Sequence, residues 1–160
     1  MKVVRWMTAV AGIASVLSVQ APDWAFGAIG DPEIILYRYP GVLDNGGAAN
    51  AGVATTFHCT NFSGVSETIR FVIRDFSAGV VANFSFTITH LTTRTLSTHL
   101  INLYLGANLN TGAIAQGTAA IAATSTSIVC TAMVVDAASF SPQGIALHGI
   151  RFNPIPGSQE

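Results

Sequence analysis

The sequence contains few charged residues. They occupy 9% of its 160 positions, whereas an average soluble domain has about 25%. The formal net charge is −1, and Lys2 is the only lysine. Proteins that bind nucleic acid or an anionic membrane surface usually carry a basic patch, and this sequence has no such cluster. The composition therefore argues against nucleic acid as a partner.

Cysteine is also scarce, since the chain has only Cys59 and Cys130. In an oxidising compartment, two cysteines form a disulfide more often than a metal site or a nucleophile. Each lies in a segment with the pattern of a strand, residues 53–61 and residues 127–136. Residues two apart on a strand share a face, so each cysteine has apolar neighbours on its own face. We expect a disulfide between packed sheets.

The N-terminus has the pattern of a secretory signal peptide. A short basic start containing Lys2 and Arg5 precedes an uncharged apolar run over residues 8–19. This run is well short of the roughly 20 residues that a membrane-spanning helix needs. We expect residues 1–27 to be a signal peptide, with cleavage between residues 21 and 28 and no integral membrane span afterwards. A retained anchor is the alternative. The mature protein is then periplasmic or extracellular.

The rest of the chain, residues 28–160, is expected to form one domain. Short apolar runs alternate with turn formers, and almost no helical periodicity is present. The expected strands cover residues 34–39, 53–61, 67–76, 80–90, 94–100, 112–124, 127–136 and 143–152. Pro40 and Gly41 are expected to end the first strand, and residues 101–111 are ambiguous between a loop and a helical turn. This pattern predicts an all-β, antiparallel, immunoglobulin-like sandwich of about eight strands with one inter-sheet disulfide. A jelly roll is the alternative.

Two blocks carry a resemblance to known proteins. The first is Cys-Thr-Asn-Phe-Ser at residues 59–63, and the second combines Ile-Ala-Leu-His at residues 145–148 with Arg-Phe-Asn-Pro at residues 151–154. They resemble a group of short, exported bacterial proteins to which no activity is attached. The resemblance covers roughly Leu36 to Glu160, and it implies export and no particular chemistry.

The histidines do not form a metal-binding motif. The four are His58, His90, His99 and His148. No two have metal-site spacing on one strand, although His90 and His99 could approach across a turn. His58 adjoins Cys59, but an exported protein uses that thiol for the disulfide. We therefore expect neither a metal site nor a cofactor.

Catalytic signatures are absent from the sequence as well. The serines and threonines include no Gly-x-Ser-x-Gly turn. Asp75 and Asp136 each follow a strand at a turn, where a carboxylate normally accepts hydrogen bonds from backbone amides. The chain is therefore not expected to be an enzyme.

An apolar outer surface is the most unusual feature. Around Cys130 one face of the strand carries Val129, Met133 and Val135, and the opposite face is apolar too. A strand that is apolar on both faces needs cover from a loop, a helix or another subunit. Residues 101–111 or the N-terminal strand are the intrachain alternatives. Arg70 and Arg74, on the outer face of another strand, complete the candidate interaction surface.

These observations favour an exported, non-enzymatic sandwich that acts through surface contacts, as an adhesion, envelope-associated or assembly subunit. Its partner is then another protein or a second copy. The alternative is a carbohydrate- or small-ligand-binding module, in which Tyr37, Tyr39 and Tyr104 form an aromatic platform. A periplasmic hydrolase is the second alternative.

Overall fold

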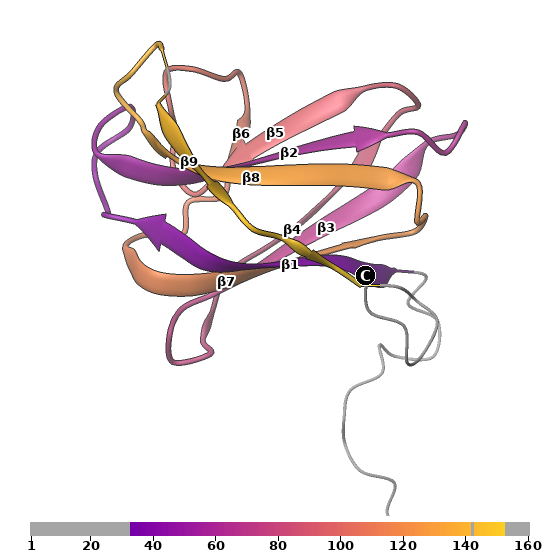
Figure 1. The fold of residues 1–160 in the computed structure, drawn as a ribbon, viewed down its shortest axis with the longest axis horizontal. Helices are drawn as coiled ribbons and strands as arrows, with labels where there is room; N and C mark the ends of the chain where they lie inside the picture. Colours follow the sequence, from indigo (N-terminus) through magenta and orange to yellow (C-terminus); the bar gives the residue numbers. More distant parts are fainter. Residues whose placement is uncertain (1–32, 142, 153–160) are drawn as a thin grey trace, which may run out of the picture.

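The computed structural model describes residues 33–141 and 143–152, which form a sandwich of two five-stranded sheets (Figure 1). The described residues contain ten strands and no helix. Accordingly, none of them belongs to a helix that is long and apolar enough to span a membrane. The all-β sandwich predicted from the sequence is confirmed. The expected signal peptide lies outside the described residues.

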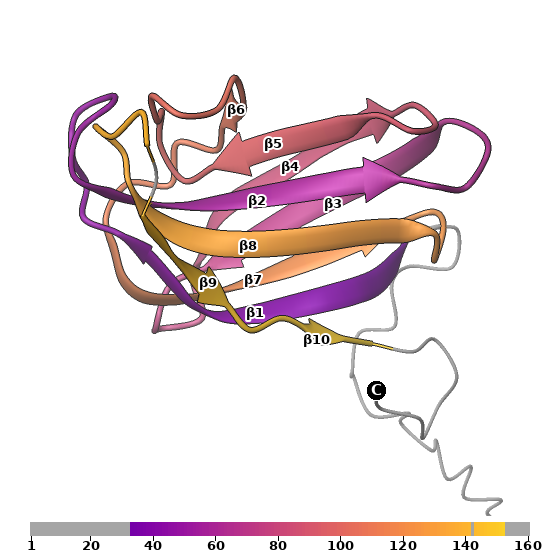
Figure 2. The same ribbon diagram turned by 45° about the horizontal axis from the view of Figure 1, so that its top comes forward.

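The order of the strands defines the two layers (Figures 1 and 2). The first sheet has the order β10 (Ile150–Arg151), β1 (Ile34–Asp44), β7 (Ile114–Ala123), β3 (Glu67–Arg74), β4 (Val80–Ile88). The second sheet has the order β6 (Ala107–Asn108), β5 (Thr93–Ser97), β2 (Val53–Asn61), β8 (Ile128–Asp136), β9 (Gly144–Leu147). All neighbours are antiparallel except β5 and β6. β4 is therefore an edge strand of the first sheet, and β5 lies near an edge of the second.

The core lies between the sheets and follows the alternation of the sequence. On β3, Ile69, Phe71 and Ile73 point inward and are fully buried. The ring of Phe71 lies 5.7 Å from that of Phe57 on β2, so aromatic side chains connect the layers. Complete burial of such a side chain contributes about 1.5–3 kcal/mol. The period-two pattern therefore fixes which face of each strand meets the other sheet.

Cys59 and Cys130 form a disulfide that is buried in this core. The predicted pairing and its position between the layers are confirmed. Its two ends, however, belong to neighbouring strands of one sheet. The two cysteines are directly opposite in the β2–β8 register, with their Cα atoms 4.2 Å apart. The alternation of a strand shows which face a cysteine occupies, but not which sheet contains the strand. In an immunoglobulin-like sandwich the bridge joins opposite sheets, so this chain differs there.

The first strand is longer than predicted. β1 passes through Pro40 and ends at Asp44, so the expectation that Pro40 and Gly41 end it is wrong. β10 pairs only with Tyr37 and Arg38 of β1, so no strand of the described residues is hydrogen-bonded to this edge of β1 at Pro40. Proline has no backbone N–H to donate, and it is tolerated where a strand edge is unpaired. Register shifts between Pro40 and Asp44, together with the positive φ of Gly41 (83°), absorb the irregularity.

The last expected strand, residues 143–152, is two strands in different sheets. β9 pairs with β8, and β10 pairs with β1. The chain crosses between the layers at Gly149, where a Cβ atom would lie 2.2 Å from a ring carbon of Tyr39. Only glycine fits this close passage over the ring. Residues 143–152 have one continuous apolar pattern, so the sequence does not indicate where the chain changes sheets.

Candidate functional site

The predicted apolar surface on β8 is largely covered. Val135 is 2% exposed and packs with Ile101, which belongs to the connection between β5 and β6. Met133 is half-buried against the same cluster, and Val129 is 46% exposed. Of the two intrachain alternatives, residues 101–111 supply the cover of Val135, through Ile101. Val135 is therefore not accessible to a partner, and the patch is reduced to its Val129 end.

Two substitutions on this face of β8 test the cover. Val135→Ala is expected to lower the free energy of unfolding by about 2 kcal/mol, because it removes buried methyl groups beneath Ile101. Val129→Ala, six residues earlier on the same face, is expected to change it by no more than about 0.5 kcal/mol. Urea denaturation of both variants measures the difference. Equal effects would show that the connection does not cover β8 in solution.

Arg70 and Arg74 lie on the outer face of β3, as predicted, and both have partners within the molecule. Arg70 is 3.6 Å from a carboxylate oxygen of Glu33, and its Nε donates to the side chain of Asn83 over 2.8 Å. Arg74 donates to the carbonyl oxygen of Ala78 over 2.7 Å. Their use as an interaction surface stays a prediction.

His58 and His90 contact a hydroxyl group and a backbone amide, respectively. Nδ1 of His58 lies 2.9 Å from the hydroxyl oxygen of Thr95, and its ring is edge-on to Tyr104 at 4.3 Å. Burial lowers the pKa of His58. His90 accepts a hydrogen bond from the backbone of Gly64. Within residues 33–141 and 143–152, no three His, Cys, Asp or Glu side chains are grouped in a way that could hold a metal ion.

The two strand-end aspartates have the predicted structural role. Oδ1 of Asp75 accepts hydrogen bonds from the backbone amides of Ser77 and Gly79, both at 2.9 Å. Oδ1 of Asp136 accepts one from Ala138 at 2.9 Å. These carboxylates cap turns, which is the role that their positions at the ends of strands predicted.

A buried acid–histidine contact was not predicted. Oδ2 of Asp44 is 2.8 Å from Nδ1 of His99, and Oδ1 accepts a hydrogen bond from Gly46. The other ring nitrogen of His99 is 3.0 Å from the carbonyl oxygen of Ala51. This nitrogen contacts a backbone carbonyl oxygen and not the side chain of a nucleophile, so the pair lacks the arrangement of a catalytic dyad. Because Ala51 lies between β1 and β2, the pair instead anchors that connection. The partners are 55 positions apart in the sequence, so no local pattern indicates the contact.

The aromatic platform expected from three tyrosines does not form. Tyr37 and Tyr39 point into the core, where their hydroxyl groups donate to the carbonyl oxygens of Ile128 and Cys130. Burial, followed by the proximity of Tyr37, raises the pKa of Tyr39. Tyr104 lies against the outer face of the second sheet. The three rings therefore share no surface, and this basis for carbohydrate binding is wrong.

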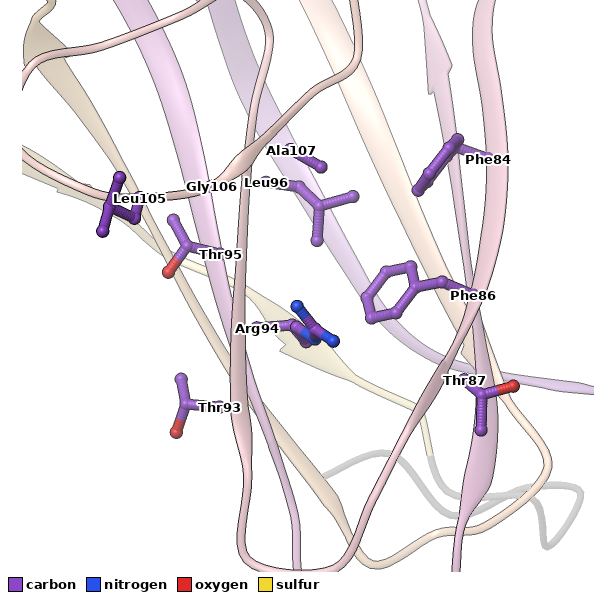
Figure 3. Close-up of a pocket in the computed structure, with 10 residues that line it drawn as sticks. All are labelled: Phe84, Phe86, Thr87, Thr93, Arg94, Thr95, Leu96, Leu105, Gly106 and Ala107. Atoms are coloured by element: carbon purple, nitrogen blue, oxygen red, sulfur yellow. The ribbon is translucent and has the colours of Figure 1, made fainter.

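A cleft opens instead at the side of the sandwich where β4 and β5 face each other. It has a volume of about 490 Å³. Figure 3 shows Phe84 and Phe86 of β4 extending toward Leu96 and Arg94 of β5. The ten lining residues are Phe84, Phe86, Thr87, Thr93, Arg94, Thr95, Leu96, Leu105, Gly106 and Ala107.

The sheets separate at this edge, so residues of the inner face reach solvent. Phe84 is 40% exposed, although Phe71, its register partner on β3, is fully buried. Phe86 stacks on Phe71 with ring centres 6.0 Å apart, and Phe84 lies 5.9 Å from Phe86. A row of aromatic rings thus runs from the core to the mouth of the cleft.

Arg94 is the unusual residue of the cleft. It lies opposite Cys59 in the β2–β5 register, on the inner face that also carries Leu96, and it is exposed. Within the described part of the chain, no carboxylate lies within salt-bridge distance of it. Sequence reasoning missed this site, although the alternation of Thr93 and Thr95 with Arg94 and Leu96 already places a charge on an apolar face.

The two ends of the cleft differ in polarity. Thr87 and Thr93 lie toward the turn between β4 and β5, whereas Phe84, Leu96 and Ala107 lie toward the other end (Figure 3). Arg94 and Phe86 lie between these two groups. The cleft therefore offers an apolar wall beside a single positive charge.

Comparisons with known proteins assign no function to the chain. No protein family matches the chain, and no curated protein does. Among solved structures, it is similar to Thermotoga maritima 1070, with a TM-score of 0.44 and 13% sequence identity, over 71% of this chain and 92% of that chain. A likeness of this size carries no argument about function.

Proposed function

We propose that this protein is an exported, non-enzymatic binding module that takes up a small ligand in the cleft between β4 and β5. The observation that carries the proposal is Arg94, an exposed cation on the inner face of a sandwich that is open at that edge. Ligand pockets typically combine apolar and aromatic walls with a few polar groups that orient the ligand. The cleft has this composition.

The chemistry of the lining favours binding over catalysis. Arg94 is the one ionisable side chain among the ten residues that line the cleft. A guanidinium group keeps its proton at physiological pH, so it orients an anion but does not act as a general acid or base. The buried Asp44 and His99 are engaged with each other and with backbone groups. A hydrolase therefore has the least support.

Export is supported by the N-terminal sequence pattern and by the disulfide. Disulfides persist in oxidising compartments, such as the periplasm and the extracellular space. The resemblance of residues 59–63 to exported bacterial proteins agrees with this location. We propose that the mature chain acts there, after cleavage between residues 21 and 28.

A role in assembly or adhesion has weaker support than ligand binding. It depends on the outer face of β8, where Val135 is buried beneath Ile101. Val129 alone is a small contact area, since specific interfaces bury about 800 Å² per partner. This face is therefore less suited to self-association than the cleft is to ligand binding.

Amide chemical shifts of the ¹⁵N-labelled protein test the proposal. The probes are octanoate and 1-octanol, which share an apolar chain and differ in charge. We expect at least one of them to shift the amide signals of residues 84, 86, 87, 93–96 and 105–107, because these residues line the cleft. Shifts confined to other surfaces, or no shifts with either probe at millimolar concentration, would overturn the proposal.

A further inference from the structure

We propose that the ligand of this cleft is a monoanionic amphiphile, an apolar chain or ring that ends in a carboxylate. This inference rests on the proposed function of the cleft and names the class of ligand. In the bound state, the carboxylate contacts Arg94 near the mouth, and the apolar part lies along Phe86 and Phe84. The features that support this assignment are the charge of the cleft, the position of that charge, and the apolar wall.

The charge of the cleft favours one negative group. None of the ten lining residues is acidic, so Arg94 meets no competing carboxylate among them. A guanidinium group presents a planar set of donors that matches the two oxygens of a carboxylate. A phosphate monoester carries nearly two negative charges at neutral pH, and the lining supplies one positive charge. A carboxylate therefore matches the site better than a phosphate does.

The position of Arg94 places the head group at the water-exposed part of the cleft. Arg94 is exposed, whereas Leu96, two residues further along the same face, is buried. A carboxylate bound to Arg94 can keep part of its hydration, which avoids the desolvation cost of a buried ion pair. An attached chain then continues away from the β4–β5 turn, toward Leu96 and Ala107 (Figure 3).

The apolar wall explains why an inorganic anion is a poorer ligand. The rings of Phe84 and Phe86 are 5.9 Å apart and form the side of the cleft opposite Leu96. A single exposed ion pair contributes little in water, about 0–1 kcal/mol. Each methylene group that is buried against these rings adds about 0.8 kcal/mol. The apolar part therefore supplies most of the affinity, and Arg94 supplies the preference for an anion.

The test compares compounds that have the same chain and different head groups. Dissociation constants are measured by NMR titration for octanoate, 1-octanol, octyltrimethylammonium and octyl β-glucoside, with acetate as the control without a chain. We expect octanoate to bind about 3- to 5-fold more tightly than 1-octanol, because the exposed ion pair with Arg94 contributes no more than about 1 kcal/mol. Octyltrimethylammonium and acetate are expected to bind more weakly than 1-octanol.

Variants of two arginines connect the preference to the cleft. Arg94→Gln is expected to reduce the affinity for octanoate to that for 1-octanol, and Arg94→Glu is expected to favour octyltrimethylammonium. Arg74→Gln removes the same charge from the outer face of β3 and is expected to leave every affinity within about twofold, because only longer-range electrostatics change. Urea denaturation confirms that each variant is folded, which is expected because Arg94 is exposed.

The outcomes separate the ligand class from the function of the cleft. Equal binding of octanoate and 1-octanol in the cleft would overturn the ligand class and leave the binding function intact. Tighter binding of octyl β-glucoside would replace the anion with a neutral sugar head group. A preference for octanoate that survives Arg94→Gln would also overturn the assignment. If no compound that carries a chain binds, both proposals fail.

Discussion

Replacing both cysteines by alanine is expected to lower the free energy of unfolding by about 4 kcal/mol. The bridge links positions 71 residues apart in the chain, and it restricts the unfolded state by closing a loop of this size. Both cysteines are also buried in the core, so the loss of the sulfur atoms adds a packing cost. Urea denaturation of the Cys59→Ala, Cys130→Ala double variant measures the change. A small domain is stable by about 5–15 kcal/mol, so the expected loss is a large fraction of the total.

Reduction of the wild-type protein separates the two contributions. The reduced protein keeps both sulfur atoms but loses the cross-link, so its destabilisation reports the effect on the unfolded chain. We expect it to account for most of the 4 kcal/mol, a magnitude set by the loop length. A change below about 1 kcal/mol in both experiments would contradict the prediction. It would show that the β2–β8 ladder alone fixes these strands in place.

Much of the fold could be predicted from the period of the sequence. The strand at residues 53–61 coincides with β2, and the predicted inward residues of β3 are fully buried. These predictions succeed because alternation in one strand depends only on which face is covered. The placement of β2 and β8 in one sheet could not be predicted, because ladder partners are chosen by contacts distant in sequence. The crossing at Gly149 depends in the same way on the ring of Tyr39, 110 positions earlier.

The candidate site was harder to predict for a related reason. A single arginine on an apolar face is a weak signal, and its meaning depends on how far the neighbouring sheet extends. Arg94 is exposed because β4 and β5 separate at the edge of the sandwich, and the sequence of β5 contains no information about β4. The cover of Val135 by Ile101 could be stated as an alternative, because an apolar strand face needs a cover. Which segment supplies it follows only from the tertiary structure.

The second large effect is expected from the buried carboxylate of Asp44. Asp44→Ala is expected to lower the free energy of unfolding by about 3 kcal/mol, because it leaves a buried donor of His99 without its acceptor and removes a second, partly buried hydrogen bond. The two donors are the amide of Gly46, at 2.7 Å, and Nδ1 of His99, at 2.8 Å. His99 also contacts the carbonyl oxygen of Ala51, so the β1–β2 connection is expected to loosen as well. Urea denaturation gives the total loss, and hydrogen exchange at residues 46–52 locates it.

Asp75→Ala is the matched control, because Asp75 also accepts hydrogen bonds from two donors. Its partners are the backbone amides of Ser77 and Gly79, in an exposed turn between β3 and β4. Water can replace a lost acceptor there, so the expected loss is no more than about 1 kcal/mol. The contrast isolates the effect of burial, since each variant removes a carboxylate with two hydrogen bonds. If Asp44→Ala costs no more than Asp75→Ala, then the contact between Asp44 and His99 does not stabilise the sandwich.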